Sequence, residues 1–251
     1  MYGVYEPWPN NCCRTTASPF LARLFIPLAI HHLTFSLHTE PAFLLTVLDG
    51  SHLQVAGLGN HGLCGTRHSV GMAVLNHLAT KLSVADQWRK DKRCCADVAF
   101  TSLGEVELVL MKPRSFMNIN GRCVVSAAEM FNLGAEDIYL VHDDLDKSLG
   151  KVALKLGGSA RGHNGVRSCI NSLKSDRMVR LRIGIGRPVG EAAVEHYVLG
   201  RFTRAEQEIL PQVFEQAVTM LLGHIQQRKS SPGTPETSGA PAKTPLGMEG
   251  A

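Results

Sequence analysis

The sequence predicts a single α/β domain over residues 52–228, built on a mixed, largely parallel, twisted sheet with helices covering both faces. Two observations predict this fold class. Short apolar segments typical of strands recur through the region, and segments with apolar residues at helical spacing lie between most of them. Alternating strands and helices place helices on the faces of a sheet. The chain has 251 residues, 44% of them apolar, and is long enough to bury a sizeable core.

Five elements are predicted in the first half of this region. Residues 52–57 form a short apolar strand that ends at a glycine. Residues 70–82 form a helix, because apolar side chains recur there at helical spacing. Residues 96–100 and 106–111 are two strands joined by a short turn that contains a glycine. Residues 120–131 form a second helix, again on the spacing of their apolar side chains.

Five more elements complete the domain. Residues 137–141 are an apolar strand that ends at a histidine and an acidic run. Residues 151–156 alternate apolar and basic side chains, which predicts a half-exposed strand. Residues 164–173 form a helix, and 179–186 form a strand with arginines on the face opposite its apolar residues. Residues 205–225 form a final amphipathic helix.

The two ends of the chain differ from the domain in composition. Residues 1–51 lack a regular hydrophobic period and are interpreted as an irregular N-terminal extension. Residues 229–251 contain four prolines, four glycines and no aromatic residue, which predicts a disordered tail. The uncharged stretch 24–39 contains a proline and three histidines and is shorter than the ~20 apolar residues of a membrane helix. No association with a membrane is therefore expected.

Charge and cysteine usage restrict the cellular setting. The first ten residues lack the basic start of a secretory signal, so we expect an intracellular protein. The extension is poor in acids and contains Arg14 and Arg23, which is compatible with a mitochondrial leader. The cytoplasm and the mitochondrion are therefore both possible locations. Seven cysteines without a Cys-x-x-Cys pair indicate a reducing environment. The net charge of +4 is compatible with a nucleic-acid partner but does not require one.

Five short polar clusters fall where loops meet strands or helices. They are residues 57–60, 66–69, 114–118, 142–146 and 162–165. Together they supply histidines, amides and a carboxylate, without a serine or cysteine nucleophile in a recognisable setting. This inventory suits a site that activates water and holds a carbonyl group by hydrogen bonds.

The glycine-rich segment 57–62 fits G-x-G-x-x-G and follows a strand, which is the fingerprint of dinucleotide binding. In that motif the loop leads directly into a helix whose N-terminus meets the phosphates. Here residues 64–68 intervene, and the acid expected after a second strand is missing. We therefore expect no nucleotide cofactor, although a nucleotide-dependent oxidoreductase stays as an alternative. The glycines are expected to permit a tight turn that exposes Asn60.

The titratable candidates each have a structural explanation as well. His68 could be a surface histidine at a helix start, and His163 lies between glycines in a turn. Asp143 follows an apolar strand, and the carboxyl edge of parallel strands is where ligands bind, but a capping role is also open. Asp144 and Asp146 are expected to be solvated. These histidines, His142 and Asp143 could in principle bind zinc, but the spacing matches no zinc motif, so no metal is expected.

Three amides complete the candidate site. Asn60, Asn118 and Asn164 lie in short loops beside glycine, methionine or histidine. An asparagine can donate to a carbonyl oxygen and accept from water, so the three could position both reactants of a hydrolysis. Asparagine is also common in turns, and only the combination of all three favours a site.

With these residues in hand, the chain resembles the bacterial-type peptidyl-tRNA hydrolases. The resemblance spans residues 52–226 through collinear motifs. The matching stretches are 55–60, 66–68, 117–118 with Gly121, 141–146, 156–165, 180–186 and 197–200. The family cleaves the ester between a peptide and the 3′ end of tRNA. The resemblance therefore implies peptidyl-tRNA as the substrate of a monomeric enzyme without cofactor or metal.

The resemblance also implies roles for individual residues. His68 would be the general base that takes a proton from water, and Asp143 would hold its ring and stabilise its cation. Asn118 would position the water or the substrate carbonyl, and Asn60 would contact the peptide or the 3′ ribose. Three further residues would line the cleft: Met117, His163 and Asn164. Of these, Asn164 would lie close to the substrate or to developing charge.

Basic residues outside the catalytic group would hold the tRNA backbone. The matching positions are Lys155 and Arg182, both expected on outward faces of strands, where phosphate contacts depend on salt. The chain departs from the family pattern at His61, Ser69 and Asp144. The alternative in another class is a tRNA-binding protein that keeps the fold without turnover. The joint presence of the histidine, its acid and all three amides favours activity.

Overall fold

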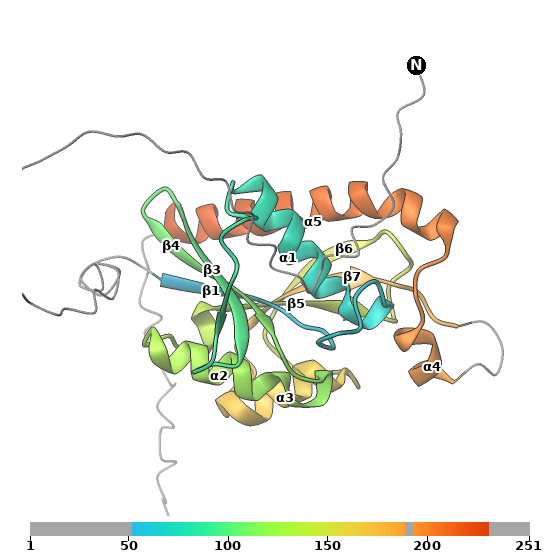
Figure 1. Cartoon of the computed structure of the whole chain (residues 1–251), viewed down its shortest axis with the longest axis horizontal. Helices are drawn as coiled ribbons and strands as arrows, with labels where there is room; N and C mark the ends of the chain where they lie inside the picture. The colour runs from blue at the N-terminus through green and yellow to red at the C-terminus, as the bar shows by residue number, and fades with distance from the viewer. Residues whose placement is uncertain (1–51, 189–192, 231–251) are drawn as a thin grey trace, which may run out of the picture.

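Seven strands form one sheet in the computed structural model, which describes residues 52–188 and 193–230 (Figure 1). Their order across the sheet is β2-β3-β4-β1-β5-β7-β6. The strands are β1 His52–Gly57, β2 Arg89–Asp91, β3 Ala96–Leu103, β4 Val106–Pro113, β5 Ile138–Asp144, β6 Val152–Leu156 and β7 Val179–Gly184. The predicted extension and nearly all of the predicted tail lie outside the described residues.

The sheet is parallel at its centre and antiparallel at its sides. β1 pairs in parallel with β4 and β5, and β5 pairs in parallel with β7. β2, β3 and β6 join by antiparallel pairing. The expected mixed sheet is confirmed. The sequence did not reveal β2, because this edge strand has three charged residues and no apolar pattern.

Helices cover both faces of the sheet, as expected. α1 Val70–Lys81 and α5 Arg204–Ser230 lie on one face, and α2 Asn120–Met130 and α3 Asn164–Leu173 lie on the other (Figure 1). The short α4 Val194–Leu199 was not predicted. Three single turns of 3-10 helix complete the described elements: η2 Arg67–Ser69, η3 Met117–Ile119 and η4 Ala135–Asp137.

The core has two layers that follow the alternation of side chains along the central strands. On one face Val55 and Tyr139 pack with residues of α1 and α5. On the other face Ala56 and Leu140 pack with residues of α2 and α3. Central strands buried on both faces read as continuous apolar runs, which explains why they were visible in the sequence.

The glycines after β1 serve helix packing. A Cβ atom on Gly71 would collide with the carbonyl oxygen of Val141, and one on Gly57 would collide with the carbonyl oxygen of Gly71. Neither Gly57 nor Gly59 has a positive φ angle. The expected tight turn is present at Gly62, which has a positive φ angle, and the N–H of Leu63 closes the turn on the carbonyl of Asn60. The expected exposure of Asn60 is wrong, because Asn60 is buried. Gly57 and Gly71 instead allow α1 to approach the sheet closely.

The strand order brings the carboxyl ends of β1, β4 and β5 to one edge of the sheet. The loops that leave these ends carry most of the polar clusters seen in the sequence. Within the described ranges, no helix has the length and apolar character needed to cross a membrane.

Candidate active site

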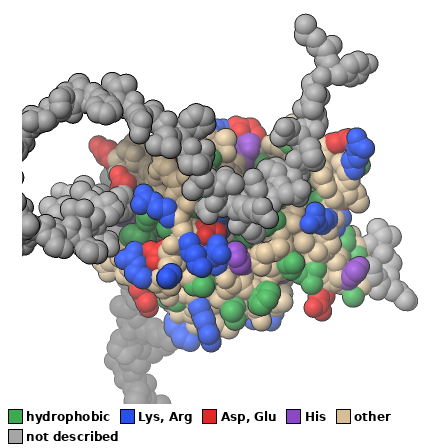
Figure 2. Space-filling view, in the orientation of Figure 1, with side chains coloured by type: hydrophobic (Ala, Val, Ile, Leu, Met, Phe, Trp, Pro, Cys, Tyr) green, Lys and Arg blue, Asp and Glu red, His purple; other side chains and the backbone are tan. Residues whose placement is uncertain are grey.

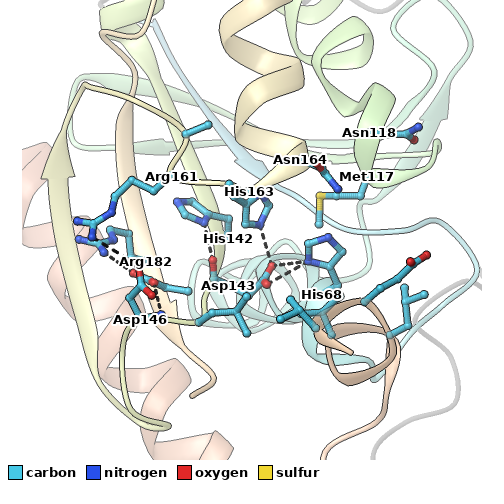
Figure 3. A pocket seen from close by; sticks show the side chains of 18 of the residues that line it. His68, Met117, Asn118, His142, Asp143, Asp146, Arg161, His163, Asn164 and Arg182 are labelled. Atoms are coloured by element: carbon cyan, nitrogen blue, oxygen red, sulfur yellow. Dashed lines mark hydrogen bonds and ion pairs between the residues drawn. The ribbon is translucent and has the colours of Figure 1, made fainter. Parts of the chain in front are cut away.

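A cleft of about 710 Å³ opens at this edge. All nine residues predicted from the sequence line it, although they come from segments spread between Asn60 and Arg182. Figure 3 shows the central group, in which side chains from η2, β5 and the start of α3 point toward one another. The nine are His68, Asp143, Asn118, Asn60, Met117, His163, Asn164, Lys155 and Arg182.

His68 and Asp143 form the centre of the cleft. The Nδ1 atom of His68 lies 3.0 Å from each carboxylate oxygen of Asp143. A carboxylate can only accept, so Nδ1 carries the proton and donates it to Asp143. The Nε2 atom of His68 then keeps its lone pair, which is the form a general base requires.

His163 contacts the same carboxylate from the other side. Its Nε2 atom lies 2.9 Å from Oδ1 of Asp143, and its Nδ1 atom accepts a hydrogen bond of 3.2 Å from the backbone N–H of Val166. The second contact caps the N-terminus of α3. Asp143 is thus shared between two imidazoles, whose ring centroids are 5.0 Å apart (Figure 3).

Asp143 stays ionised in this setting. Burial alone would raise the pKa of Asp143, whose residue is only 2% exposed. The electrostatic interaction with His163 and the hydrogen bonds from His163 and His68 outweigh burial and hold this pKa far below its usual range. The carboxylate is therefore a permanent acceptor for both rings near neutral pH.

His142 forms the wall behind His163. Its Nδ1 atom donates to the backbone carbonyl of Asp143 at 2.7 Å, and its ring packs edge-on against His163 at 4.6 Å between centroids. Burial, and then the electrostatic interaction with His163, lower the pKa of His142 to about 3. Its buried Nε2 has no hydrogen-bond partner among the described residues. His142 is thus a neutral ring at physiological pH.

His68, Asp143 and His163 also offer three atoms within 4.8 Å of one another, a spacing that could hold a metal ion. The separations of 2.9–3.0 Å between nitrogen and oxygen are those of hydrogen bonds. Tetrahedral zinc with bonds of ~2.0 Å would separate its ligand atoms by ~3.3 Å. In this geometry an N–H proton of each ring occupies the space between the rings and the carboxylate, so the group fits hydrogen bonding better than metal binding.

Asn60 connects the loop after β1 to the segment after β4. Its Oδ1 atom accepts from the backbone N–H of Met117 at 2.7 Å, and its own backbone N–H donates to Oγ of Ser69 at 3.1 Å. Since Oδ1 is occupied, Nδ2 is the side-chain group able to donate to a bound molecule. Met117 is buried and forms the floor beside it.

Asn118 and Asn164 lie at the rim of the cleft, and both are exposed. Figure 3 shows the Asn118 amide set apart from the imidazoles and Asp143. The Oδ1 atom of Asn164 accepts a long contact of 3.5 Å from the guanidinium of Arg167. The structure therefore places these two amides at the same opening, without a hydrogen bond from either side chain to His68 or Asp143.

The basic end of the cleft differs from expectation. Arg182 forms an ion pair of 2.5 Å with Asp144, and the two side chains are 17% and 8% exposed. The expectation that Asp144 is solvated is wrong. Arg182 was expected on an outward face of its strand, but its side chain is largely buried against Asp144. β7 lies between β5 and β6 in the sheet. The loop that follows β6 packs over the arginines of β7, and buried Arg180 donates to the carbonyls of Ser159 and Gly158 in this loop. Exposed Asp146 agrees with expectation.

Lys155, the second cation of the predicted pair, is partly buried in the same cleft. Burial, and then the neighbouring charges of Arg180, Arg182 and Arg161, lower the pKa of Lys155. Cations that disfavour one another in this way attract an anion. Figure 3 shows Arg161 and Arg182 across the site from Met117 and Asn118.

The opposite end of the cleft is apolar. Four of its lining residues are large hydrophobic side chains with at least 39% of their area exposed. They are Leu63, Phe116, Val194 and Leu199. Exposed apolar side chains that gather at a cleft mark a binding surface for an apolar group.

Two functional positions were missed by sequence reasoning. Asn120 is fully buried: its Oδ1 atom accepts from the N–H of Gly59 at 3.0 Å, and its Nδ2 donates to the carbonyl of Phe116 at 2.9 Å. Arg67 forms an ion pair of 2.7 Å with Glu206, and its guanidinium lies 4.3 Å from the ring centroid of Tyr197. Both hold the loops that carry site residues. Both residues lie within or beside the sequence motifs, and this position could have pointed to them. Most of the residues that they contact lie too far along the chain to be inferred from the sequence.

An imidazole base held by a buried carboxylate, beside amides and an exposed apolar surface, suits an enzyme that activates water. The family model described as peptidyl-tRNA hydrolase matches residues 54–234. The chain is 60% identical over 183 residues to a probable peptidyl-tRNA hydrolase of Mus musculus, covering 73% of this chain and 90% of that protein. This chain belongs to the peptidyl-tRNA hydrolase family.

Relatives in bacteria agree with this assignment. A peptidyl-tRNA hydrolase of Mycobacterium avium is 41% identical over 167 residues, covering 66% of this chain and 86% of that protein. The crystal structure of peptidyl-tRNA hydrolase from Acinetobacter baumannii superposes with a TM-score of 0.64 at 30% identity. It covers 71% of this chain and 91% of that chain. The fold as well as the sequence is that of the family.

Proposed function

We propose that this chain hydrolyses the ester between a peptide, or an N-blocked aminoacyl group, and the 3′ end of tRNA, releasing free tRNA. Its membership of the peptidyl-tRNA hydrolase family supports this activity. The single observation that carries the mechanism is the contact of His68 Nδ1 with Asp143, which leaves Nε2 of His68 as a base inside the cleft.

In this mechanism His68 acts as the general base. Its Nε2 atom takes a proton from a water molecule as the water oxygen attacks the ester carbonyl carbon. The ring becomes an imidazolium, and the Asp143 carboxylate stabilises that charge. When the tetrahedral intermediate collapses, the bond from carbon to the 3′ oxygen breaks, and the oxygen takes the proton from Nε2. The products are a tRNA with a free 3′ hydroxyl and a peptide carboxylic acid, which releases its proton to solvent to become a carboxylate.

The amides position the reactants. The Nδ2 group of Asn60 donates to the substrate near the ester, and Asn118 positions the water or the carbonyl from the rim. Asn164 contacts the substrate or the developing charge, and Met117 packs against the terminal nucleotide or the peptide. His163 lines the same cleft.

The two ends of the cleft orient the substrate. Lys155 and Arg182 contact tRNA phosphate at the basic end. The apolar end, which includes Phe116 and Leu63, holds the peptide side of the ester. The ester then lies between these ends, at His68.

The reaction needs no nucleotide cofactor and no metal. The glycines that resemble a nucleotide loop are used to pack α1 against the sheet, which supports this reading. All the proposed catalytic groups come from one chain, so we infer a monomeric enzyme. The five free cysteines in the described part of the chain suit a reducing intracellular compartment, in the cytoplasm or the mitochondrion.

The test is hydrolysis of N-acetyl-aminoacyl-tRNA by the full chain, with free aminoacyl-tRNA as the control substrate. We expect release of deacylated tRNA from the N-blocked substrate and much slower release from the control. Tight binding of the N-blocked substrate without turnover would instead support the alternative, a catalytically inactive tRNA-binding protein on the same fold.

A further inference from the structure

His163 has no ring nitrogen left for the substrate. Its Nδ1 accepts the backbone N–H of Val166, so this nitrogen carries no proton. The proton of a neutral ring must then be on Nε2, which lies 2.9 Å from Oδ1 of Asp143 and donates to it. Capping of α3 thereby selects the tautomer that faces the carboxylate.

We propose that His163 is a positioning residue that acts on His68 through Asp143, and not a substrate-binding residue. This inference rests on the proposed function, in which His68 is the base. The N–H of His163 holds Oδ1 of Asp143 in place and takes part of its negative charge. The carboxylate is then oriented toward Nδ1 of His68. Because part of its negative charge is taken up by His163, it stabilises the imidazolium form of His68 less strongly than a carboxylate without this donor would.

The surroundings of His163 keep its ring in one orientation. The backbone N–H of Val166 holds one side, and the neutral ring of His142 packs edge-on against it. His142 is itself fixed by its bond to the backbone carbonyl of Asp143. A donor held this rigidly suits the placement of a catalytic carboxylate, because small displacements of such a group reduce rates strongly.

Removal of the His163 donor should change the pH dependence of hydrolysis in one direction. A carboxylate with one donor fewer keeps more of its charge, so it stabilises the imidazolium form of His68 more strongly. The base is then occupied by a proton up to a higher pH, and the acidic limb of the kcat/KM profile moves upward. Three elements pack around the turn that carries His68: β5, α4 and α1. Their ionisable groups are His142, Asp143 and Asp144 on β5, Glu195, His196 and Tyr197 on α4, and His77 and Lys81 on α1, of which the last two pair with Glu215. Arg67 and His163 are the other ionisable neighbours.

Two substitutions separate the two contacts of His163. In His163→Asn the side-chain oxygen falls near the position of Nδ1, so it can still cap α3, but no group reaches Asp143. In His163→Gln the amide nitrogen falls near the position of Nε2, so it can still donate to Asp143, but the cap is lost. A role in folding predicts that Asn is the better replacement, whereas a role through Asp143 predicts that Gln is.

The readouts are kcat, KM and the pH profile of kcat/KM on N-acetyl-aminoacyl-tRNA. For His163→Asn we expect kcat to fall roughly 10-fold or more with KM within about twofold. We expect its acidic limb to move up by at least about half a pH unit, since a hydrogen bond to a charged group is lost. His163→Gln should retain kcat within about threefold and keep the limb of the wild type. A raised KM with unchanged kcat and pH limb in His163→Asn would overturn the proposal in favour of substrate binding.

An NMR titration of the His68 ring in the free protein separates this proposal from the proposed function. It needs no substrate, so it stays informative if the wild type shows no hydrolysis. We expect the titration curve of His68 to move to higher pH in His163→Asn and to stay in place in His163→Gln. Coincident curves for wild type and His163→Asn would overturn the inference, whatever the hydrolysis assay shows.

Discussion

The Nδ1 atom of His68 lies 3.0 Å from both carboxylate oxygens of Asp143, and both residues are buried at the floor of the cleft. η2 supplies the histidine and β5 the acid, so the contact joins segments 75 residues apart. The contact fixes which nitrogen of His68 carries the proton and which faces the cleft as a base.

Asp143→Asn should reduce hydrolysis of N-acetyl-aminoacyl-tRNA by about 100-fold or more, the range for loss of general-base function. An asparagine amide can donate to His68, which favours the tautomer with its proton on Nε2 and removes the base. Single-turnover rates measure this directly. Asp86→Asn, an exposed substitution with the same chemistry, should keep the wild-type rate. Equal rates for Asp143→Asn and the wild type would contradict the role of the carboxylate.

Lys155→Ala should weaken tRNA binding and reduce the slope of log Kd against log salt concentration by about 1, because one phosphate contact is lost. Lys92→Ala removes the same charge at an exposed position away from the cleft and should leave the slope unchanged. Binding measured between low and moderate salt gives both slopes. If the two variants have the same slope as the wild type, Lys155 does not contact phosphate.

Arg182 requires a different design, because its ion pair with Asp144 is nearly buried. Arg182→Ala alone would leave a buried charge unpaired, at a cost of about 3–5 kcal/mol of stability. The double substitution Arg182→Gln with Asp144→Asn removes both charges and should recover most of that loss in urea unfolding. If the double variant folds but binds tRNA with an unchanged salt slope, Arg182 serves stability alone.

Gly71→Ala should destabilise the fold by about 2 kcal/mol or more, because the added Cβ collides with the backbone between α1 and β5. Gly223→Ala lies in α5, where an added Cβ meets nothing within 4 Å. It should stabilise the fold by about 0.5–1 kcal/mol through helix propensity. Urea unfolding of the two variants checks these opposite signs. Equal effects would mean that the approach of α1 does not require glycine.

His142 predicts how stability changes with pH. Its pKa falls from an ordinary value of 6.5 to about 3 on folding, so the unfolded chain binds the proton more readily. The neutral ring therefore contributes its full share of the free energy of unfolding above pH 6.5, and this contribution is lost as the pH falls toward 3. Between pH 7 and pH 4 this amounts to about 3 kcal/mol. In His142→Asn the decline in unfolding free energy over that interval should be smaller by this amount; an identical decline would contradict the burial of a neutral ring.

Much of the fold could be predicted from the sequence, because its central strands are apolar and its helices have regular spacing. α3 was predicted with the bounds that the structure gives it, Asn164–Leu173. β2 was not predicted because its three residues are all charged, and α4 was not predicted because six residues are too few to show a helical period. Such segments take their conformation from their neighbours in space, which a local pattern cannot reveal.

The site was predicted as a set of residues but not as a geometry. The motifs and the positions matched beside them named all nine residues that line the cleft. Most of these residues lie at the end of a strand or the start of a helix, whereas Lys155 and Arg182 lie within β6 and β7. The sequence could not show that His163 and His68 share Asp143, or that Arg182 is paired with Asp144. Those contacts depend on the register of β5 against β7 and on the loop before α3, which no single segment determines.

The most direct measurement is single-turnover hydrolysis of N-acetyl-aminoacyl-tRNA by His68→Ala, beside His77→Ala as a matched control. His77 is a partly exposed histidine on α1 that pairs with Glu215, outside the cleft. We predict a loss of at least about 100-fold in His68→Ala and a rate within about twofold of the wild type in His77→Ala. Hydrolysis by His68→Ala at the wild-type rate would contradict the assignment of His68 as the base that activates water.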